Sequence, residues 1–185
     1  MKLSRNVTFV TIGLLLAGIM LGGSIAGTLA AESTTKDSAK EIALDDAGYA
    51  EGDVTFDEVE KGKEQGAAVY EIEFWTDTEE FEYDIAIADG EIVSVSRKQT
   101  DPSPSGPEVT KSEAKGIALS HAGADKDQVT FTKDSIGTED GIPVYEFKFE
   151  DSAAKYEYEI MKEGGEILSY SKTIKTPACV SAAKK

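Results

Sequence analysis

The residues able to carry catalysis or to bind a metal ion are few and scattered along the chain. There is one histidine, His121, and one cysteine, Cys179. A zinc site built from nitrogen and sulfur ligands needs about four such groups, and a histidine-dependent triad needs a nucleophile in a tight turn nearby. Nothing around His121, which follows Ser120 on an expected helix, suggests either arrangement. We therefore predict no catalytic residue, no cofactor and no metal site, and we interpret His121 as a surface residue.

Carboxylates are abundant, with 35 Asp and Glu against 19 Lys and Arg, so pairs for acid–base chemistry are available by number. However, Glu71, Glu73, Glu82 and Asp84 alternate with apolar residues, as on the solvated face of a sheet. No glycine-rich phosphate loop follows a strand, and no loop has the spacing of a dedicated calcium site. The sequence predicts a protein that is not an enzyme. The alternative, a hydrolase that uses carboxylates, would need a concave acidic cluster with raised pKa values.

The charge excludes several classes of partner. The formal net charge is −16, and residues 31–185 carry 17 basic and 35 acidic groups. Such a surface repels nucleic acid and anionic lipid headgroups, so we expect no nucleic-acid partner. Two interpretations remain open: a well-hydrated exported domain, or a docking face for cations or a basic partner.

Residues 1–30 have the pattern of an export signal. Lys2 and Arg5 precede a largely apolar run over residues 7–21, and Thr28-Leu29-Ala30 supplies small residues for a cleavage site. We favour a cleaved signal peptide, which makes the protein secreted or displayed on the cell surface. The alternative is a retained N-terminal anchor, because the uncharged stretch of residues 6–31 is long enough to span a bilayer. Contact with the membrane is expected only through this segment.

The remainder of the chain is organised by an internal repeat. Residues 39–97, the first repeat, align without a gap on residues 114–172, the second repeat, with about 25 of 59 positions identical. Each repeat is long enough to be a small domain. Together with the flanking sequence, this predicts domains at residues 35–98 and 110–173. A Pro- and Ser-rich linker at 99–109 separates them, and a poorly ordered tail follows at 174–185.

Within each repeat the apolar residues first recur with the spacing of a helix and then at every second position, as in a strand. A capped amphipathic helix is expected first, followed by four strands with one apolar and one acidic face. The predicted fold class is α+β: two tandem copies of a helix packed on a four-stranded antiparallel sheet.

The repeat resembles the PepSY domain, the peptidase propeptide and YpeB-like family. Five motifs carry the resemblance in order, each with a matching partner in the second repeat: residues 39–48, 54–56, 69–74, 82–85 and 90–92. The resemblance implies a non-catalytic module of the bacterial cell envelope that restrains or inhibits peptidases. It supplies no fixed catalytic or ligand residues to transfer. No peptidase domain follows the repeats, so an extracellular peptidase partner would be a separate protein.

Four residues are candidates for partner contact. Trp75 has Glu150 as its counterpart in the second repeat, and Tyr170 has Val95 in the first. Either aromatic residue could pack within the molecule or anchor a partner. Glu71 and Glu73 lie on the expected acidic face, which could reinforce the pairing of an exposed strand edge with a partner's extended segment. The predicted function is an exported binding module that restrains an extracellular peptidase. The alternative is an acidic envelope adaptor or cation-binding module with no peptidase target.

Overall fold

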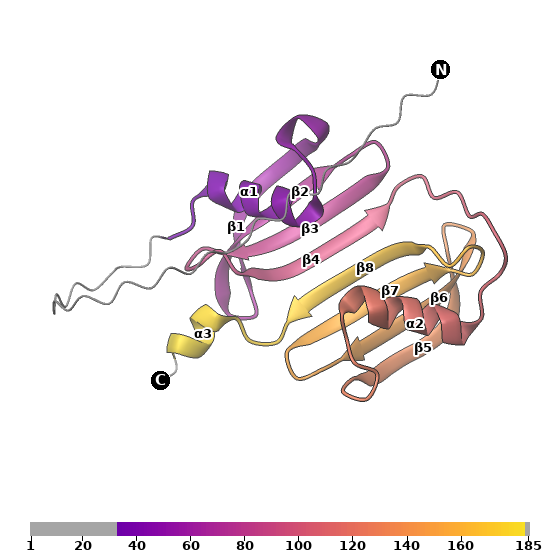
Figure 1. The fold of residues 1–185 in the computed structure, drawn as a ribbon. Helices are drawn as coiled ribbons and strands as arrows, with labels where there is room; N and C mark the ends of the chain where they lie inside the picture. Colours follow the sequence, from indigo (N-terminus) through magenta and orange to yellow (C-terminus); the bar gives the residue numbers. More distant parts are fainter. Residues whose placement is uncertain (1–32, 184–185) are drawn as a thin grey trace, which may run out of the picture. The chain divides into compact units, whose positions relative to one another are not determined.

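The computed structural model describes residues 33–183, and within them each repeat forms one helix followed by four strands (Figure 1). The first repeat contains α1 (Lys36–Ala47), the 3-10 turn η1 (Glu51–Asp53), β1 (Thr55–Glu64), β2 (Ala67–Trp75), β3 (Glu79–Ala86) and β4 (Ile92–Gln99). The second contains α2 (Lys111–Ala122), β5 (Thr130–Glu139), β6 (Ile142–Glu150), β7 (Ala154–Met161) and β8 (Ile167–Ile174), and it is followed by α3 (Ala178–Ala183). The predicted α+β fold class is confirmed.

The predicted signal or anchor segment, residues 1–30, lies outside the described residues. Among the helices that the structure describes, none has the length and apolar character needed to cross a membrane.

The two long helices are capped at both ends, as the sequence analysis expects of the helix in each repeat. The Thr110 side chain accepts a hydrogen bond from the backbone N–H of Glu113, and the Glu113 carboxylate accepts one from the N–H of Thr110, which completes a capping box. Both helices end at a glycine with positive φ, 79° at Gly48 and 63° at Gly123, a conformation that costs glycine least. The caps therefore set the length of each helix before any packing is considered.

The strands of both repeats form one antiparallel sheet, in the order β1-β2-β3-β4-β8-β7-β6-β5. The sequence predicted two four-stranded sheets and left their arrangement open. In the structure β4 pairs with β8, which closes one edge of each repeat. The outer strands are then β1 and β5, the first strand of each repeat.

The register of β4 against β8 relates the repeats by an approximate two-fold axis. Ser96 lies opposite Ser171, its own counterpart in the alignment of the repeats, and Ser94 lies opposite Thr173. The axis therefore passes between Ser96 and Ser171, as in an isologous dimer interface within one chain. The hydroxyls of Ser94 and Thr173 lie 3.1 Å apart, and the Gln99 side-chain amide donates to the Ile167 carbonyl at 2.9 Å.

Each helix covers the apolar face of its own repeat, which we call the helix face. Helix α1 contacts β2 and β3, and α2 contacts β6 and β7. Small helix residues such as Ala39 and Ala114 are fully buried and allow close packing. The two cores contain matched aromatic and aliphatic strand residues: Tyr70, Ile72, Phe74, Phe81, Tyr83 and Ile85 in the first, and Tyr145, Phe147, Phe149, Tyr156, Tyr158 and Ile160 in the second.

The C-terminal tail differs from the prediction. Residues 174–185 were expected to be poorly ordered, but residues 178–183 form α3. Cys179 and Val180 of α3 pack on a buried cluster of Ala67, Val69, Ala86 and Val93, on the opposite side of the sheet from α1. The counterparts of three of these residues are larger: Ile142, Met161 and Leu168. The small side chains of the first repeat leave room that α3 fills, which the sequence pattern of the tail alone could not reveal.

Substitution of Ala86 by methionine, the residue at the matched position of the second repeat, should displace α3. Ala86 is fully buried, and overpacking of this kind costs about 1–3 kcal/mol. We expect the alkylation rate of Cys179, the sole thiol, to rise severalfold. Met161→Ala serves as the control, because it destabilises the second repeat without touching α3. An unchanged thiol rate in Ala86→Met would show that α3 does not pack on this cluster.

Candidate functional site on the polar face of the sheet

The side of the sheet opposite α1 and α2, which we call the polar face, carries most of the strand charges. The burial of β2 alternates, with Tyr70, Ile72 and Phe74 buried toward the helix and Glu71 and Glu73 exposed on the other side. Strands β3, β6 and β7 alternate in the same way. The predicted acidic face therefore exists, and its carboxylates come from at least two adjacent strands in each repeat.

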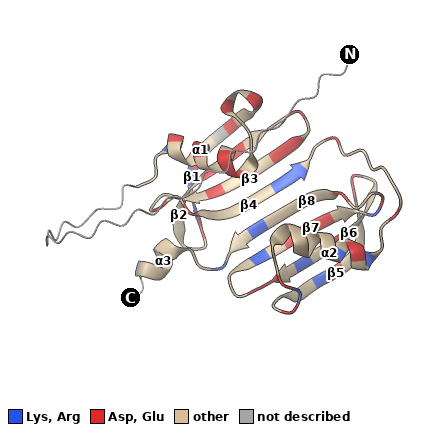
Figure 2. Ribbon diagram, in the orientation of Figure 1, with Lys and Arg blue, Asp and Glu red and all other residues tan. Residues whose placement is uncertain are grey.

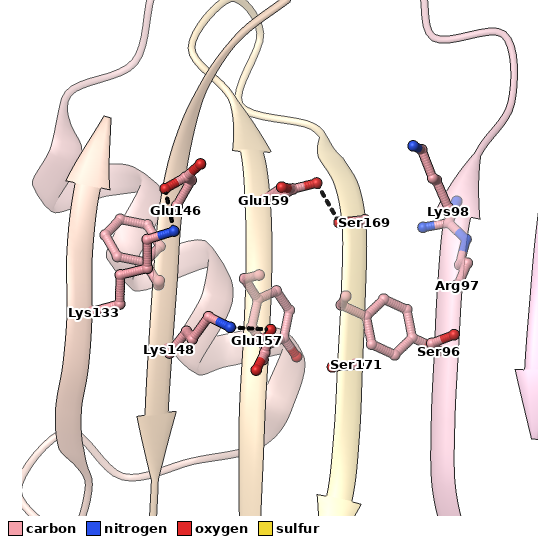
Figure 3. A pocket seen from close by; sticks show the side chains of 13 residues that line it. Ser96, Arg97, Lys98, Lys133, Glu146, Lys148, Glu157, Glu159, Ser169 and Ser171 are labelled. Carbon is pink, nitrogen blue, oxygen red and sulfur yellow. Dashed lines mark hydrogen bonds and ion pairs between the residues drawn. The ribbon is translucent and has the colours of Figure 1, made fainter. Parts of the chain in front are cut away.

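A shallow depression of about 330 Å³ lies on the polar face where the two repeats join (Figure 3). Its floor holds the short side chains of Ser96 on β4 and of Ser169 and Ser171 on β8. Glu157 and Glu159 of β7 border it on the second-repeat side. Four basic side chains also line it, those of Arg97, Lys98, Lys133 and Lys148, so the depression carries both signs of charge and suits a polar ligand rather than an apolar one.

Lysines neutralise the carboxylates of the second repeat. Lys133 contacts Glu146 at 2.6 Å, Lys148 contacts Glu157 at 2.6 Å, and Ser169 donates to Glu159 at 2.7 Å (Figure 3). The Lys133 ammonium and the Ser135 hydroxyl hold the pKa of the Glu146 carboxyl below its usual range, against the opposing effect of burial. This half of the polar face is therefore occupied by its own ion pairs.

The first repeat has acidic residues where the second has lysines. Glu58, Glu73 and Glu80 stand at the positions of Lys133, Lys148 and Lys155. Figure 2 shows acidic residues on β3 and basic residues interspersed on the strands of the second repeat, while the basic segment at the end of β4 holds Arg97 and Lys98.

Carboxylates of the first repeat also face one another across the strands. Glu71 lies directly opposite Asp84, and Glu73 lies opposite Glu82. Directly opposed like charges destabilise a sheet. Partial burial, together with the nearby carboxylates of Glu64, Glu71 and Glu82, raises the pKa of Asp84 to about 7. The pKa of Glu73 is raised as well, by desolvation and then by neighbouring acids. The first repeat thus concentrates negative charge on β2 and β3. Ser96 donates a hydrogen bond to Glu82, but among the described residues Lys98, the nearby cation, pairs with Glu139 and Asp140 instead of these carboxylates.

The four predicted contact residues lie in two different places. Glu71, Glu73 and Trp75 share the polar face of β2, and Trp75 is 39% exposed at the end of that strand, opposite Glu80 and Thr55. Tyr170 lies on the helix face, where it packs against the cores of both repeats. The structure brings the first three together and separates Tyr170 from them.

Tyr170 belongs to a cluster of aromatic residues between the repeats. Its ring contacts His121 at 4.6 Å and stacks on Tyr158 at 5.9 Å between centroids, and the Tyr158 hydroxyl lies 2.9 Å from His121 Nδ1. The matched pair in the first repeat is Tyr83 and Asp46. The Tyr83 hydroxyl donates a hydrogen bond to the Asp46 carboxylate at 2.9 Å. Desolvation lowers the pKa of His121, and Arg97 adds to this effect. His121 is thus the hydrogen-bond partner of a tyrosine, and the described residues contain no group of three or more His, Cys, Asp or Glu side chains that could hold a metal ion.

The fold and the site now allow comparison with known proteins. Residues 108–170 match the PepSY family, described as the peptidase propeptide and YPEB domain. The chain contains a PepSY domain. The match covers the second repeat, and the first repeat reproduces its elements in the same order, so the PepSY arrangement occurs in tandem.

One sequence relative and two solved structures can be compared with this chain. An uncharacterized protein of Streptococcus pyogenes serotype M6 is 44% identical over 62 residues, which cover 34% of this chain and 48%, about half, of that protein. A proposed lipoprotein of Clostridium difficile 630 aligns in structure over 74% of this chain and 91% of its own, with 15% identity and a TM-score of 0.30. The Bacillus megaterium YpeB C-terminal domain aligns over 77% and 99%, with 12% identity and a TM-score of 0.30.

Sequence reasoning missed the charge difference between the two PepSY repeats. It treated the acidic strand residues of both repeats as one solvated face. A position-by-position comparison of the aligned repeats shows the lysines at 133, 148 and 155 against acids at 58, 73 and 80. The serine floor at the junction depends on the pairing of β4 with β8, which the sequence did not specify.

Proposed function

We propose that this PepSY protein is an exported, non-catalytic binding module that holds a positively charged segment of a partner protein on the polar face of its first repeat. The observation that carries the proposal is the mismatch between the repeats: lysine pairs neutralise the second, whereas the matched positions of the first are acidic. A basic partner would supply the missing positive charge. Action outside the cytoplasm accords with the PepSY match and with the export pattern at residues 1–30.

The partner that we propose is an extracellular peptidase, which the protein restrains by binding rather than by chemistry. The description of the matched family as a peptidase propeptide domain supports this choice. The competing function is a cation-binding or adaptor module of the envelope. Calcium titration separates the two, because a large gain in stability at millimolar calcium would favour the cation-binding module.

Capture from the surface of the producing cell tests the proposal, with the full chain as bait. We expect it to retain a basic protein with peptidase activity and to lower that activity. The double variant E73K/E80K, which installs the lysines of the second repeat, should bind this protein about tenfold more weakly, a loss of about 1.4 kcal/mol.

The matched control is E41K/D45K, which changes the net charge equally but on exposed positions of α1, across the sheet from the polar face. Binding by this control should stay within about twofold of the parent. Equal losses in both variants would show that net charge, not the polar face, attracts the partner. Unchanged binding in E73K/E80K would contradict the proposal.

A further inference from the structure

The two outer strands of the sheet, β1 and β5, are both available for pairing along their outer edges. No other described strand lies beside either of them. An edge strand presents unpaired backbone N–H and C=O groups, onto which an extended segment of another chain can add. The repeats therefore offer two matched docking edges, which differ in their side chains.

Each edge strand contains a glycine over which a glutamate of the next strand lies. A Cβ atom at Gly62 of β1 would overlap the Glu71 carboxylate, and one at Gly137 of β5 would overlap that of Glu146. The missing side chains let both carboxylates lean from the second strand toward the open edge. In both repeats a glycine of the edge strand thus leaves room for a glutamate carboxylate of the next strand.

The second repeat shows which side chains form an ion pair and a hydrogen bond with such a carboxylate. Glu146 is contacted by Lys133 at 2.6 Å and accepts a hydrogen bond from Ser135 at 2.8 Å, both from the edge strand itself. The residues at the matched positions of β1 are Glu58 and Glu60, which are both acidic. Among the side chains that the structure describes, Glu71 makes no ion pair or side-chain hydrogen bond. Glu71 therefore stands where Glu146 does but lacks the ammonium group.

Helix α2 ties the β5 edge further to its own repeat. Asp134 of β5 pairs with Lys111 at 2.9 Å and with Lys115 at 2.7 Å. The residue at the matched position of β1 is Val59, which cannot form such pairs. Charged side chains of β5 are thus paired within this chain on both faces of the sheet, Lys133 on the polar face and Asp134 on the helix face.

We propose that β1 is the receptive edge, and that it pairs with an extended segment of a partner protein carrying a lysine or arginine whose side chain reaches Glu71 across Gly62. The inference rests on the proposed function and specifies how its basic partner binds. Neighbouring strands are about 4.8 Å apart, so the incoming strand lies about 10 Å from β2. The long stem of a lysine and the inclined Glu71 side chain together span that gap. The Lys133–Glu146 pair of the second repeat is the internal template for this contact.

The test is calorimetric titration of the full chain with a ten-residue peptide of alternating lysine and threonine. The matched probe has the same sequence but N-methyl groups on alternate backbone nitrogens, which removes strand pairing and keeps the charge. We expect one site for the first peptide and at least tenfold weaker binding of the second. Equal binding of both peptides would overturn edge pairing, while leaving a charge-driven role of the polar face intact.

Two variants exchange the edge chemistry between the repeats. E58K/E60S gives β1 the residues of β5 and should abolish the site, because Glu71 is then paired internally. K133E/S135E gives β5 the acids of β1 and should create a second site, raising the stoichiometry from about one to two. Retained binding in E58K/E60S would contradict the inference even if K133E/S135E failed to fold.

The remaining outcomes are also informative. Absence of binding by either peptide would overturn both the inference and the basic-segment part of the proposed function. Self-association of the parent chain in sedimentation, lost in E58K/E60S, would assign the edge to a second copy of this protein and exclude the basic-segment occupant.

Discussion

Tyr170→Ala should lower the free energy of unfolding of the whole sheet by about 2–3 kcal/mol. Tyr170 belongs to the second repeat, but it packs against the buried cores of both. Truncation of a buried aromatic residue costs about 3–5 kcal/mol, and Tyr170 is only partly buried. Its contacts with His121 and Tyr158 add to the loss, since aromatic pairs contribute beyond the area they bury.

Trp75 reports whether this loss reaches the first repeat. It is the sole tryptophan and lies in β2. In urea unfolding, the midpoint of Trp75 emission should fall together with the midpoint of the far-UV circular dichroism, as expected for one cooperative unit. Tyr170→Phe, which keeps the ring, should stay within about 0.5 kcal/mol of the parent. A Trp75 midpoint that does not move in Tyr170→Ala would mean that the repeats unfold independently.

Asp84→Asn should stabilise the protein at pH 8. Burial and neighbouring carboxylates raise the pKa of Asp84 from 3.8 to about 7 in the folded state, so the charged form is disfavoured by folding. A shift of this size would correspond to roughly 4 kcal/mol, but the side chain is only partly buried and solvent screens the repulsion. We expect a gain of about 1–2 kcal/mol in the free energy of unfolding at pH 8.

The stability gain of Asp84→Asn should depend on pH. Above pH 7 Asp84 is ionised in both states, and the folded state bears the cost. As the pH falls from 7 toward 4, Asp84 becomes protonated in the folded state first, the cost disappears, and the advantage of Asp84→Asn should vanish. His121 acts oppositely, because its lowered pKa means that stability is lost as the pH falls below about 6.5.

The stability of the double variant D84N/H121F should therefore depend less on pH between pH 5 and 8 than that of either single variant, and the raised pKa of Glu73 contributes to the dependence that remains. A gain for Asp84→Asn that is the same at pH 5 and pH 8 would contradict the assigned charge effect.

The sequence was sufficient to predict the elements of each repeat. Thr110 and Gly123 mark the ends of α2, and the alternation of Tyr145, Phe147 and Phe149 marks the buried side of β6. These signals are local, because caps depend on backbone groups within a few residues and alternation depends on the two-residue period of a strand. The predicted helix and four strands of each PepSY repeat followed from them.

The features that decide the candidate site are not local. Whether Val95 or Tyr170 faces solvent depends on the pairing of β4 with β8, which come from different repeats. The same pairing leaves β1 and β5 as the outer strands and joins the acidic faces of the two repeats on one side of a single sheet. Helix α3 was missed for a related reason: its partners Ala67 and Ala86 belong to the first repeat, far earlier in the chain.

The measurement that tests the account most directly is nuclear magnetic resonance mapping of the alternating lysine and threonine peptide on the isotope-labelled full chain. The account predicts amide shift changes that are largest along β1 and continue into Glu71 and Glu73 of β2, with slowed hydrogen exchange at the outer amides of β1. It predicts little change along β5, where Lys133 already contacts Glu146. Shifts concentrated on β5, or spread equally over both repeats, would contradict the assignment of binding to the first repeat.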